Sequence, residues 1–134
     1  MNFGFQRKTD LALRALRRLG TPGMKVSGSA LSSAIGTTTS FLPQIVAPLI
    51  DRGWVASERG PGGGYSLTEA SVDVSLFDLL EATEGPTVDG RCVLRDQPCP
   101  GNDSCPAHVV WTDARGVLIE GLRKIPAVDA GERP

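Results

Sequence analysis

The sequence predicts a mostly α-helical protein with a winged helix-turn-helix unit, whose wing is a small β-hairpin, and a long C-terminal helix. Two observations carry this prediction: apolar residues recur at helical spacing in several segments, and a glycine-rich run separates two short β-prone segments. We expect the winged helix-turn-helix unit at 1–85, a cysteine-containing loop at 86–106, a helix that pairs two subunits at 107–126 and a disordered tail at 127–134.

The composition indicates one modest core with a helical extension. The chain has 134 residues, of which 40% are hydrophobic, and this length buries one core of ordinary size. The apolar stretch from Phe41 to Ile50 is too short to cross a bilayer, and the N-terminus lacks the apolar core of a signal peptide. We therefore expect a soluble, cytoplasmic protein with no membrane partner.

Charge is distributed unevenly along the chain. Residues 1–60 carry eight Lys or Arg and three acidic side chains, a net charge of +5, whereas residues 61–134 carry six basic and twelve acidic side chains, a net charge of −6. A basic half is typical of a surface that faces phosphate, although ordinary solvated charge produces similar counts. The charge pattern is compatible with nucleic acid binding.

The first helix is expected to be capped by Thr9 or Asp10 and to end at Gly20. Its apolar positions recur at helical spacing, at Leu11, Ala12, Ala15, Leu16 and Leu19. The arginines of this segment fall at other positions of the helix.

Two shorter helices are predicted next. The first spans Ser29–Ile35 and ends at Gly36, and its apolar side is expected to be Ala30, Leu31, Ala34 and Ile35. Hydroxyl side chains at 37–40 then precede a helix from Phe41 to about Asp51. A short helix, a glycine turn and a polar-capped helix form the helix-turn-helix pattern.

Two prolines fall within this third helix. Pro43 lies in the first turn, where its missing N–H would have no partner. Pro48 removes a hydrogen bond to the Gln44 carbonyl, at a cost of about 3 kcal/mol. We therefore expect a kink or a shortened helix at Pro48.

A β-hairpin is predicted after this helix. Two short strands are expected near Trp54–Ser57 and Tyr65–Leu67, joined by a glycine-rich tip that starts at Arg59. A hairpin directly after a helix-turn-helix is a wing, whose glycines allow close approach to a duplex. A nucleotide-binding glycine loop is disfavoured because no Lys-Ser or Lys-Thr follows.

Two further helices are expected. Ser75 can cap one that runs through Ala82, with Leu76, Leu79 and Leu80 inward. A final helix runs from Pro106 or Ala107 to about Ile125, with an apolar seam at Trp111, Ala114, Leu118, Gly121 or Leu122, and Ile125. We expect this seam to pack against a second subunit, with packing on its own domain as the alternative.

All three cysteines, Cys92, Cys99 and Cys105, lie within fourteen residues of one another. An odd number of cysteines without a secretory signal favours reduced thiols that bind metal or react. Structural zinc sites usually pair ligands about two to four residues apart, whereas these gaps are six and five residues. Iron-sulfur clusters use cysteine thiolates, with histidine as an accepted replacement.

The order of these motifs resembles the Rrf-two family of bacterial winged-helix regulators, which includes IscR, NsrR and RirA. The resemblance covers about residues 3–125, and it rests on Lys8-Thr9-Asp10-Leu11-Ala12-Leu13-Arg14, Ser40-Phe41-Leu42-x-Gln44, Arg59-Gly60-Pro61-Gly62-Gly63-Gly64-Tyr65-x-Leu67, the clustered cysteines and Cys105-Pro106-x-His108-x-x-Trp111. It implies a homodimeric transcription factor, not an enzyme, that binds a palindromic operator in double-stranded DNA. One iron-sulfur cluster per subunit would control this binding.

Three cysteines leave one cluster position open. His108 lies three residues after Cys105, as in the IscR-like pattern. Asp10 is the alternative, because its context resembles NsrR-type members in which an N-terminal acidic residue reaches the cluster from the other subunit. A capping role explains either residue without metal. The Asp10 context favours a 4Fe-4S over a 2Fe-2S cluster, and nitric oxide or iron over oxygen or redox state as the signal.

The side chains expected to face DNA bases lie at the start of the third helix and are Thr38, Ser40, Phe41 and Gln44. The residues expected to position the DNA backbone are Arg7, Lys8 and Arg59, with Gly60 and Gly62 in the wing tip. Several family members carry an acidic residue where this chain has Pro43, so their base preferences do not transfer.

Two other functions remain alternatives. A cluster-free regulator of the same fold would use the cysteines as a reversible disulfide or a zinc site. An enzyme or electron carrier is disfavoured because the single histidine follows a cysteine of the loop and no substrate-binding motif is present.

Overall fold

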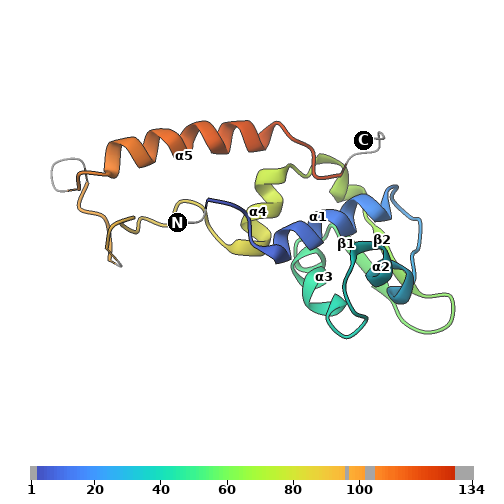
Figure 1. Ribbon diagram of the computed structural model, residues 1–134. Coiled ribbons are helices and arrows are strands. Elements are labelled where there is room, and N and C mark those ends of the chain that lie inside the picture. The colour runs from blue at the N-terminus through green and yellow to red at the C-terminus, as the bar shows by residue number, and fades with distance from the viewer. Residues whose placement is uncertain (1–2, 96, 102–104, 129–134) are drawn as a thin grey trace.

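The computed structural model describes residues 3–95, 97–101 and 105–128. Its elements, in chain order, are α1 (Arg7–Leu19), α2 (Gly28–Ile35), α3 (Leu42–Asp51), β1 (Val55–Glu58), β2 (Gly64–Leu67), the 3-10 helix η1 (Glu69–Asp73), α4 (Leu76–Glu84) and α5 (His108–Arg123) (Figure 1). The predicted fold class, mostly helical with a hairpin wing, is confirmed. No helix among the described residues is long and apolar enough to span a membrane.

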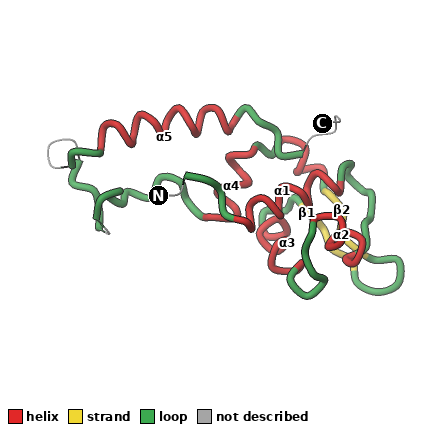
Figure 2. The backbone as a smooth tube through the Cα atoms, viewed as in Figure 1, coloured by secondary structure: helices red, strands yellow, loops and turns green. Residues whose placement is uncertain are grey.

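α1 is the central helix of the body, and α2, α3, α4 and β2 all pack against it (Figure 2). Its inner face is made of the apolar positions that the sequence predicts, and each is at most 1% exposed: Leu11, Ala12, Ala15, Leu16 and Leu19. Removing this surface from water is the main favourable term in folding a unit of this size.

The start of α1 differs from the sequence prediction. The helix begins at Arg7, with Gln6 at its N-cap and no capping side chain, so neither Thr9 nor Asp10 is the cap. Asp10 instead forms an ion pair with Arg14, one turn further along the helix, at 3.0 Å.

A carboxylate from α4 takes over the capping role. Glu84 accepts a hydrogen bond from the Gln6 N–H at 3.0 Å and another from the Thr9 hydroxyl. The buried Thr9 hydroxyl also lies 2.7 Å from the Thr83 hydroxyl. The end of α4 therefore satisfies one free amide at the start of α1 and places a negative charge where the helix favours it.

α2 begins with a side-chain cap, because the Ser27 hydroxyl accepts the Ala30 N–H at 3.2 Å. Its predicted apolar side is wrong in two places: Leu31 and Ile35 are buried as expected, whereas Ala30 and Ala34 are exposed. Ser32 takes a buried position instead. Its hydroxyl donates to the Ser29 carbonyl at 3.1 Å, which removes the cost of burying it.

α3 runs through Pro48 to Asp51, so the expected shortening at Pro48 is wrong. The helix buries four apolar side chains: Leu42, Ile45, Val46 and Leu49. Each such side chain contributes about 1.5–3 kcal/mol when buried, which outweighs the roughly 3 kcal/mol cost of the proline. At the start of α3, the Thr38 hydroxyl accepts the Phe41 N–H at 3.2 Å, as the hydroxyl-rich segment predicts.

β1 and β2 form the predicted hairpin. They are antiparallel, with Val55 opposite Leu67 and Glu58 opposite Gly64. Val26, just before α2, extends this sheet, because it exchanges two backbone hydrogen bonds of 2.8 Å with Tyr65. The wing is thereby tied to the helix-turn-helix.

Two of the wing glycines are required by the hairpin itself. A Cβ at Gly64 would lie 2.4 Å from the Val26 carbonyl oxygen, and one at Gly63 would lie 2.3 Å from the Glu58 carbonyl oxygen. Gly60 and Gly62 have no neighbouring atom within 4 Å of an added Cβ. Gly63 and Gly64 are therefore explained by the hairpin, whereas Gly60 and Gly62 have open space around them, as the predicted close approach to a duplex requires.

Ser75 caps α4 as predicted. Its hydroxyl accepts the Asp78 N–H at 3.1 Å, and the Asp78 carboxylate accepts the Ser75 N–H at 2.9 Å, which completes a capping box. The helix continues to Glu84, two residues past the predicted end at Ala82. The short η1 before it was not predicted.

α5 is anchored at its C-terminal end and extends away from the body at its N-terminal end (Figure 1). The Leu76 N–H donates to the Ile125 carbonyl at 2.7 Å, and the Ala127 N–H donates to the Val74 carbonyl at 2.8 Å. The Arg123 guanidinium lies over the Phe77 ring, 4.3 Å from its centroid.

The predicted seam and tail need correction. Trp111 is half-buried beside Phe3, with ring centroids 5.8 Å apart, and Leu122 is buried in its own core. Of the two alternatives for that seam position, Leu122 is therefore excluded, whereas Gly121 is exposed. The structured chain also continues into the expected tail, because Ala127 is fully buried and Val128 packs against the core. Residues 129–134 of that tail lie outside the described residues.

We expect Gly64→Ala to destabilise the protein by about 2–4 kcal/mol, because the new Cβ meets the Val26 backbone. Gly60→Ala is the matched control: its φ of 87° gives it only backbone strain, which costs about 1–2 kcal/mol. Urea denaturation of both variants measures the difference. Equal loss of stability in the two variants would show that the contact with Val26 does not matter.

Candidate metal centre and nucleic-acid interface

Cys92 and Cys99 lie on the two opposite limbs of a small loop. The Cys92 N–H donates to the Gln97 carbonyl and the Cys99 N–H donates to the Gly90 carbonyl, each at 2.9 Å. Arg91 and Pro98 form an isolated antiparallel bridge between them. This backbone pairing places the two thiols on neighbouring limbs.

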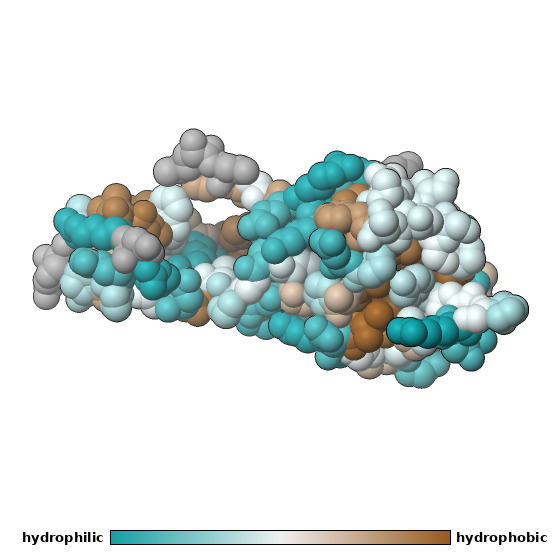
Figure 3. All heavy atoms as spheres, turned by 90° about the horizontal axis from the view of Figure 1, so that it is seen from below, coloured by the Kyte–Doolittle hydropathy of each residue, from teal (hydrophilic) through white to brown (hydrophobic). Residues whose placement is uncertain are grey.

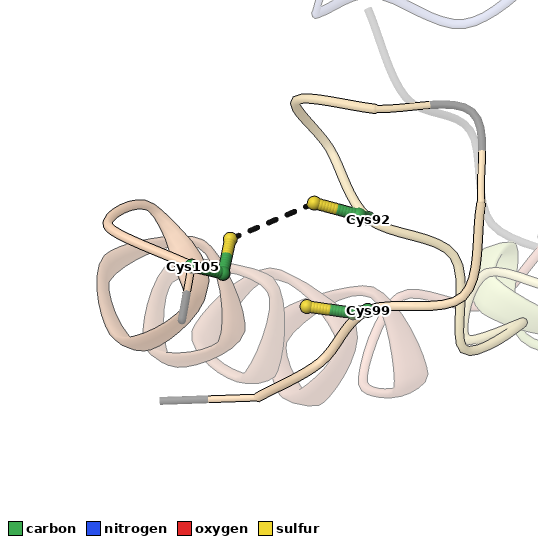
Figure 4. Close-up of side chains that lie close together, drawn as sticks. All are labelled: Cys92, Cys99 and Cys105. Atoms are coloured by element: carbon green, nitrogen blue, oxygen red, sulfur yellow. Dashed lines mark hydrogen bonds between the residues drawn. The ribbon is translucent and has the colours of Figure 1, made fainter. Parts of the chain in front are cut away.

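Cys105 approaches from the turn that leads into α5. Its N–H donates to the Gly101 carbonyl at 3.0 Å, and its carbonyl accepts the His108 N–H at 3.2 Å. Its sulfur lies 3.6 Å from the Cys92 sulfur, and the three sulfurs all lie within 4.8 Å of one another (Figure 4). The loop therefore brings together all three cysteines that the sequence predicts as ligands.

The sulfur spacing fits thiolate binding to metal. Two thiolates on one tetrahedral metal lie about 3.8 Å apart, given metal–sulfur bonds of about 2.3 Å, and the separation between Cys92 and Cys105 is 3.6 Å. A four-iron cluster places each ligand on a different iron, so its thiolates must be farther apart. The loop would have to widen to hold such a cluster.

Local interactions shift the pKa values of two cysteines in opposite directions. The backbone N–H of Leu94 lowers the pKa of Cys92, against the effect of burial, and the backbone N–H of Arg95 adds to the lowering. Burial raises the pKa of Cys105, because a poorly solvated site disfavours the thiolate. In the absence of metal, Cys92 therefore ionises before Cys105.

The two residues considered for the fourth ligand position differ in placement. Nδ1 of His108 lies 3.2 Å from the Cys99 sulfur. Asp10 is half-exposed on α1 and paired with Arg14. Among the described residues of one chain, the group of close ligand atoms contains the three cysteine sulfurs and neither of these two side chains.

A small cavity of about 60 Å³ adjoins Cys99 and Cys105. His108, Trp111 and Arg115 line it from α5, and they recur at i, i+3 and i+7 on one face of the helix. Sequence reasoning assigned Trp111 to a subunit seam and did not consider Arg115. The i, i+3, i+7 spacing from His108 was the signal that could have placed both beside the cysteines.

The residues predicted to face DNA bases gather around one surface hollow at the start of α3. Thr38, Ser40, Phe41 and Gln44 line it, together with Gly36 and Thr37. All four predicted residues are exposed. The structure thus presents them to solvent on one surface, as contact with a duplex requires.

A second groove lies between the wing, α3 and the start of α2. Arg59 and Gly60 line its wing side, and Gly62 is exposed at the tip. Arg7 and Lys8 are exposed in the first turn of α1 and line neither hollow. The predicted DNA-contacting residues therefore fall on α3, the wing and α1 rather than on one continuous site.

Residues 5–128 match the family model Rrf2, which is described as an iron-dependent transcriptional regulator. The chain belongs to the Rrf2 family of transcriptional regulators. The family resemblance that the motifs indicate is thereby confirmed. Its relatives IscR and an rrf2-like protein are named as transcriptional regulators.

Two relatives illustrate the match. An rrf2-like HTH-type transcriptional regulator of Rhodobacter capsulatus is 38% identical over 142 aligned positions, covering 92% of this chain and 91% of that protein. The HTH-type transcriptional regulator IscR of Pectobacterium carotovorum is 33% identical over 95 residues, covering 71% of this chain and 57% of IscR. This Rrf2-family chain thus spans just over half of the length of that IscR.

Solved structures share the Rrf2-family fold of this chain. CymR of B. subtilis, the global cysteine regulator, has a TM-score of 0.72 and 21% identity, with 94% of each chain covered. IscR of T. potens has a TM-score of 0.70 and 23% identity, covering 96% of this chain and 86% of that one. The oxidised form of CymR from Staphylococcus aureus has a TM-score of 0.73 and 20% identity, with 98% and 99% covered. At 20–23% identity, these similarities show that the fold is shared.

We expect alkylation of metal-free protein to separate Cys92 from Cys105 by pH. Both thiols are buried. As the pH falls, Cys105 loses its reactive thiolate first because its pKa is raised, and Cys92 keeps its thiolate to a lower pH because its pKa is lowered. Iodoacetamide labelling followed by peptide mass spectrometry measures both rates against pH. Identical pH profiles would contradict the opposite pKa shifts.

Proposed function

We propose that this Rrf2-family chain is a homodimeric, DNA-binding transcription regulator of the cytoplasm whose operator binding is controlled by an iron-sulfur cluster. The observation that carries the proposal is the convergence of three thiols, from an open loop, to within 4.8 Å of one another. Cys92, Cys99 and Cys105 would be the protein's own ligands. When bound, the cluster would supply a redox- and ligand-sensitive group beside α5.

The proposed dimer contact is the exposed side of α5, within the proposed pairing segment 107–126. The apolar side chains of this segment are largely exposed: Val109, Val110, Val117 and Leu118 on α5, and Ile125 just after it. Figure 3 shows hydrophobic side chains on the part of the molecule that projects from the body. A row of exposed apolar residues on an extended helix favours a second copy of the same helix as its partner.

The proposed DNA surface combines the start of α3 with the wing. Gln44 can pair with adenine, and the hydroxyls and ring edge of Thr38, Ser40 and Phe41 can meet base edges or thymine methyl groups. Arg59 at the wing, with Arg7 and Lys8 on α1, would contact phosphates or the minor groove. α3 and the wing lie on the opposite side of the body from α5 (Figure 1), so dimerisation and DNA contact by these two elements need not compete.

The fourth position of the cluster is proposed for Asp10 of the partner subunit or for His108. An aspartate oxygen is a weak ligand for iron in a thiolate site. It would make the cluster labile toward nitric oxide, oxygen or iron loss, which suits a sensor. We favour a four-iron cluster, one per subunit, although the present sulfur spacing requires the loop to widen around it.

We expect Cys99→Ala to abolish the cluster and Asp10→Ala to make it lose iron faster, since each removes a proposed ligand. Native mass spectrometry of protein purified without oxygen distinguishes a dimer with two four-iron clusters from two-iron, zinc and empty forms. Full iron and sulfide in Cys99→Ala would remove Cys99 from the ligand set. Ser104→Ala is a same-loop control that carries no proposed ligand.

A second candidate function is a cluster-free, thiol-based or zinc-binding regulator of the same fold. The 3.6 Å contact between the Cys92 and Cys105 sulfurs favours it, because a disulfide between them would need only a small movement. One of the structures of similar fold is an oxidised form of CymR. A clean metal-free or zinc mass for protein from iron-replete cells would support this function and contradict the cluster.

We expect Arg59→Ala to weaken operator binding by about 5- to 50-fold and to reduce its salt dependence, because a groove or phosphate contact is lost. The control is Arg18→Ala, which removes an exposed cation in the last turn of α1. Fluorescence anisotropy with operator DNA at two salt concentrations measures both effects. Unchanged affinity in Arg59→Ala, with an intact cluster spectrum, would exclude the wing from the DNA contact.

A further inference from the structure

The groove between the wing, α3 and the start of α2 carries more negative than positive charge. Among the described residues that line it, the charged side chains are Asp51 at the end of α3 and Glu58 and Arg59 at the wing. Two carboxylates and one guanidinium sum to a net charge of −1. The proposed DNA-contacting cation of the wing, Arg59, therefore adjoins a carboxylate that would repel the phosphate backbone.

Glu58 has a cationic partner from outside the wing. Its carboxylate forms an ion pair with the ammonium group of Lys25, which lies in the segment between α1 and α2. The positive charge of Lys25 offsets the negative charge of Glu58. With Lys25 included, the four side chains carry no net charge, and the carboxylate beside Arg59 is neutralised.

The backbone places Lys25 within reach of Glu58. Val26, the next residue, exchanges two backbone hydrogen bonds with Tyr65 of β2, and Gly64 leaves no room for a Cβ beside the Val26 carbonyl. Glu58 on β1 lies opposite Gly64 in the hairpin. Because Gly64 has no side chain, the lysine can extend across β2 to the carboxylate on β1.

The ion pair is too exposed to contribute much to stability. The Lys25 and Glu58 side chains are 48% and 61% exposed, and solvent screens the attraction between charges at such positions. Its effect is therefore expected when a third charge approaches the groove. A phosphate that enters the groove meets a neutralised pair in the wild type and an unpaired carboxylate when Lys25 is removed.

We propose that Lys25 is a positioning residue of the DNA-binding surface, because its ion pair with Glu58 neutralises the carboxylate beside Arg59 and allows the groove to accept the phosphate backbone. The inference rests on the proposed function, since it concerns how this groove meets DNA. Lys25 acts through Glu58 and does not itself contact the duplex. Its contribution to DNA binding should therefore disappear when residue 58 carries no charge.

The test compares four full-length proteins: wild type, Lys25→Ala, Glu58→Gln and the double variant. The probe is a fluorescein-labelled duplex that the wild type selects from a random-sequence pool, and fluorescence anisotropy measures the dissociation constant. We expect Lys25→Ala to weaken binding by about 3- to 10-fold, because an unpaired carboxylate then faces phosphate. In the Glu58→Gln background, the same change should alter affinity by less than about twofold.

Two further measurements separate this role from a structural one and from bulk charge. Lys25→Arg keeps the positive charge and should bind the duplex like the wild type, and urea denaturation should show similar stability in all these variants. The matched controls are Arg18→Ala and Glu69→Gln, which remove the same charges from exposed positions that line neither hollow. Their effects on affinity should be additive in the double control.

An equal loss of affinity from Lys25→Ala in both backgrounds would overturn the inference, because Lys25 would then act on DNA independently of Glu58. Weaker binding by Glu58→Gln alone would also overturn it, since the carboxylate would then favour the complex. A wild type that selects no duplex would contradict the proposed function, and the inference would fall with it. That result is distinguishable because it involves the wild type alone.

Discussion

The rest of the structure depends on the burial of one face of α1. α2, α3, α4 and β2 all contact it, and their buried apolar residues share one core with its inner face. The helix-turn-helix, the wing and α4 therefore hold fixed positions relative to one another because they share one buried surface. Without it, neither the start of α3 nor the tip of the wing would have a defined place.

The end of α4 connects the start of α1 to the entry of the cysteine loop. Glu84 at the end of α4 bonds the Gln6 N–H and the Thr9 hydroxyl at the start of α1. Glu81, one turn earlier, accepts a hydrogen bond from the Thr87 N–H at the entry to the loop. These hydrogen bonds thus hold both the entry of the loop and the first turn of α1, where Asp10 and the exposed basic residues lie, to the end of α4.

α5 gives the cysteine site its unusual position. The helix is held to the body by backbone hydrogen bonds at its C-terminal end, whereas its N-terminal end carries Cys105 and His108 away from the core (Figure 1). The two cysteine-bearing limbs of the loop meet it there (Figure 4). The site therefore lies at the end of an arm with exposed apolar residues, where a second subunit can both cover the arm and approach the thiols.

Much of the fold could be predicted from local sequence, and the failures have identifiable causes. Periodicity located the buried face of α1, Ser75 located the start of α4, and the glycine run located the wing, because each depends on neighbouring residues only. Thr9 was misassigned as a cap because its partners, Thr83 and Glu84, lie more than seventy residues away. Leu122 was offered as a seam residue but is buried in its own core, because helical spacing alone does not tell which face of a lone helix meets its own chain.

The sequence by itself determined the element types, the family and the set of three cysteines, because these follow from residue identity and short-range spacing. Only the tertiary structure decided which groups meet: the three sulfurs within 4.8 Å, the Cys99–His108 contact and the capping of α1 by Glu84. The physical reason is that these contacts join segments whose separation is set by how helices pack around α1 and where α5 is anchored. No local pattern encodes those distances.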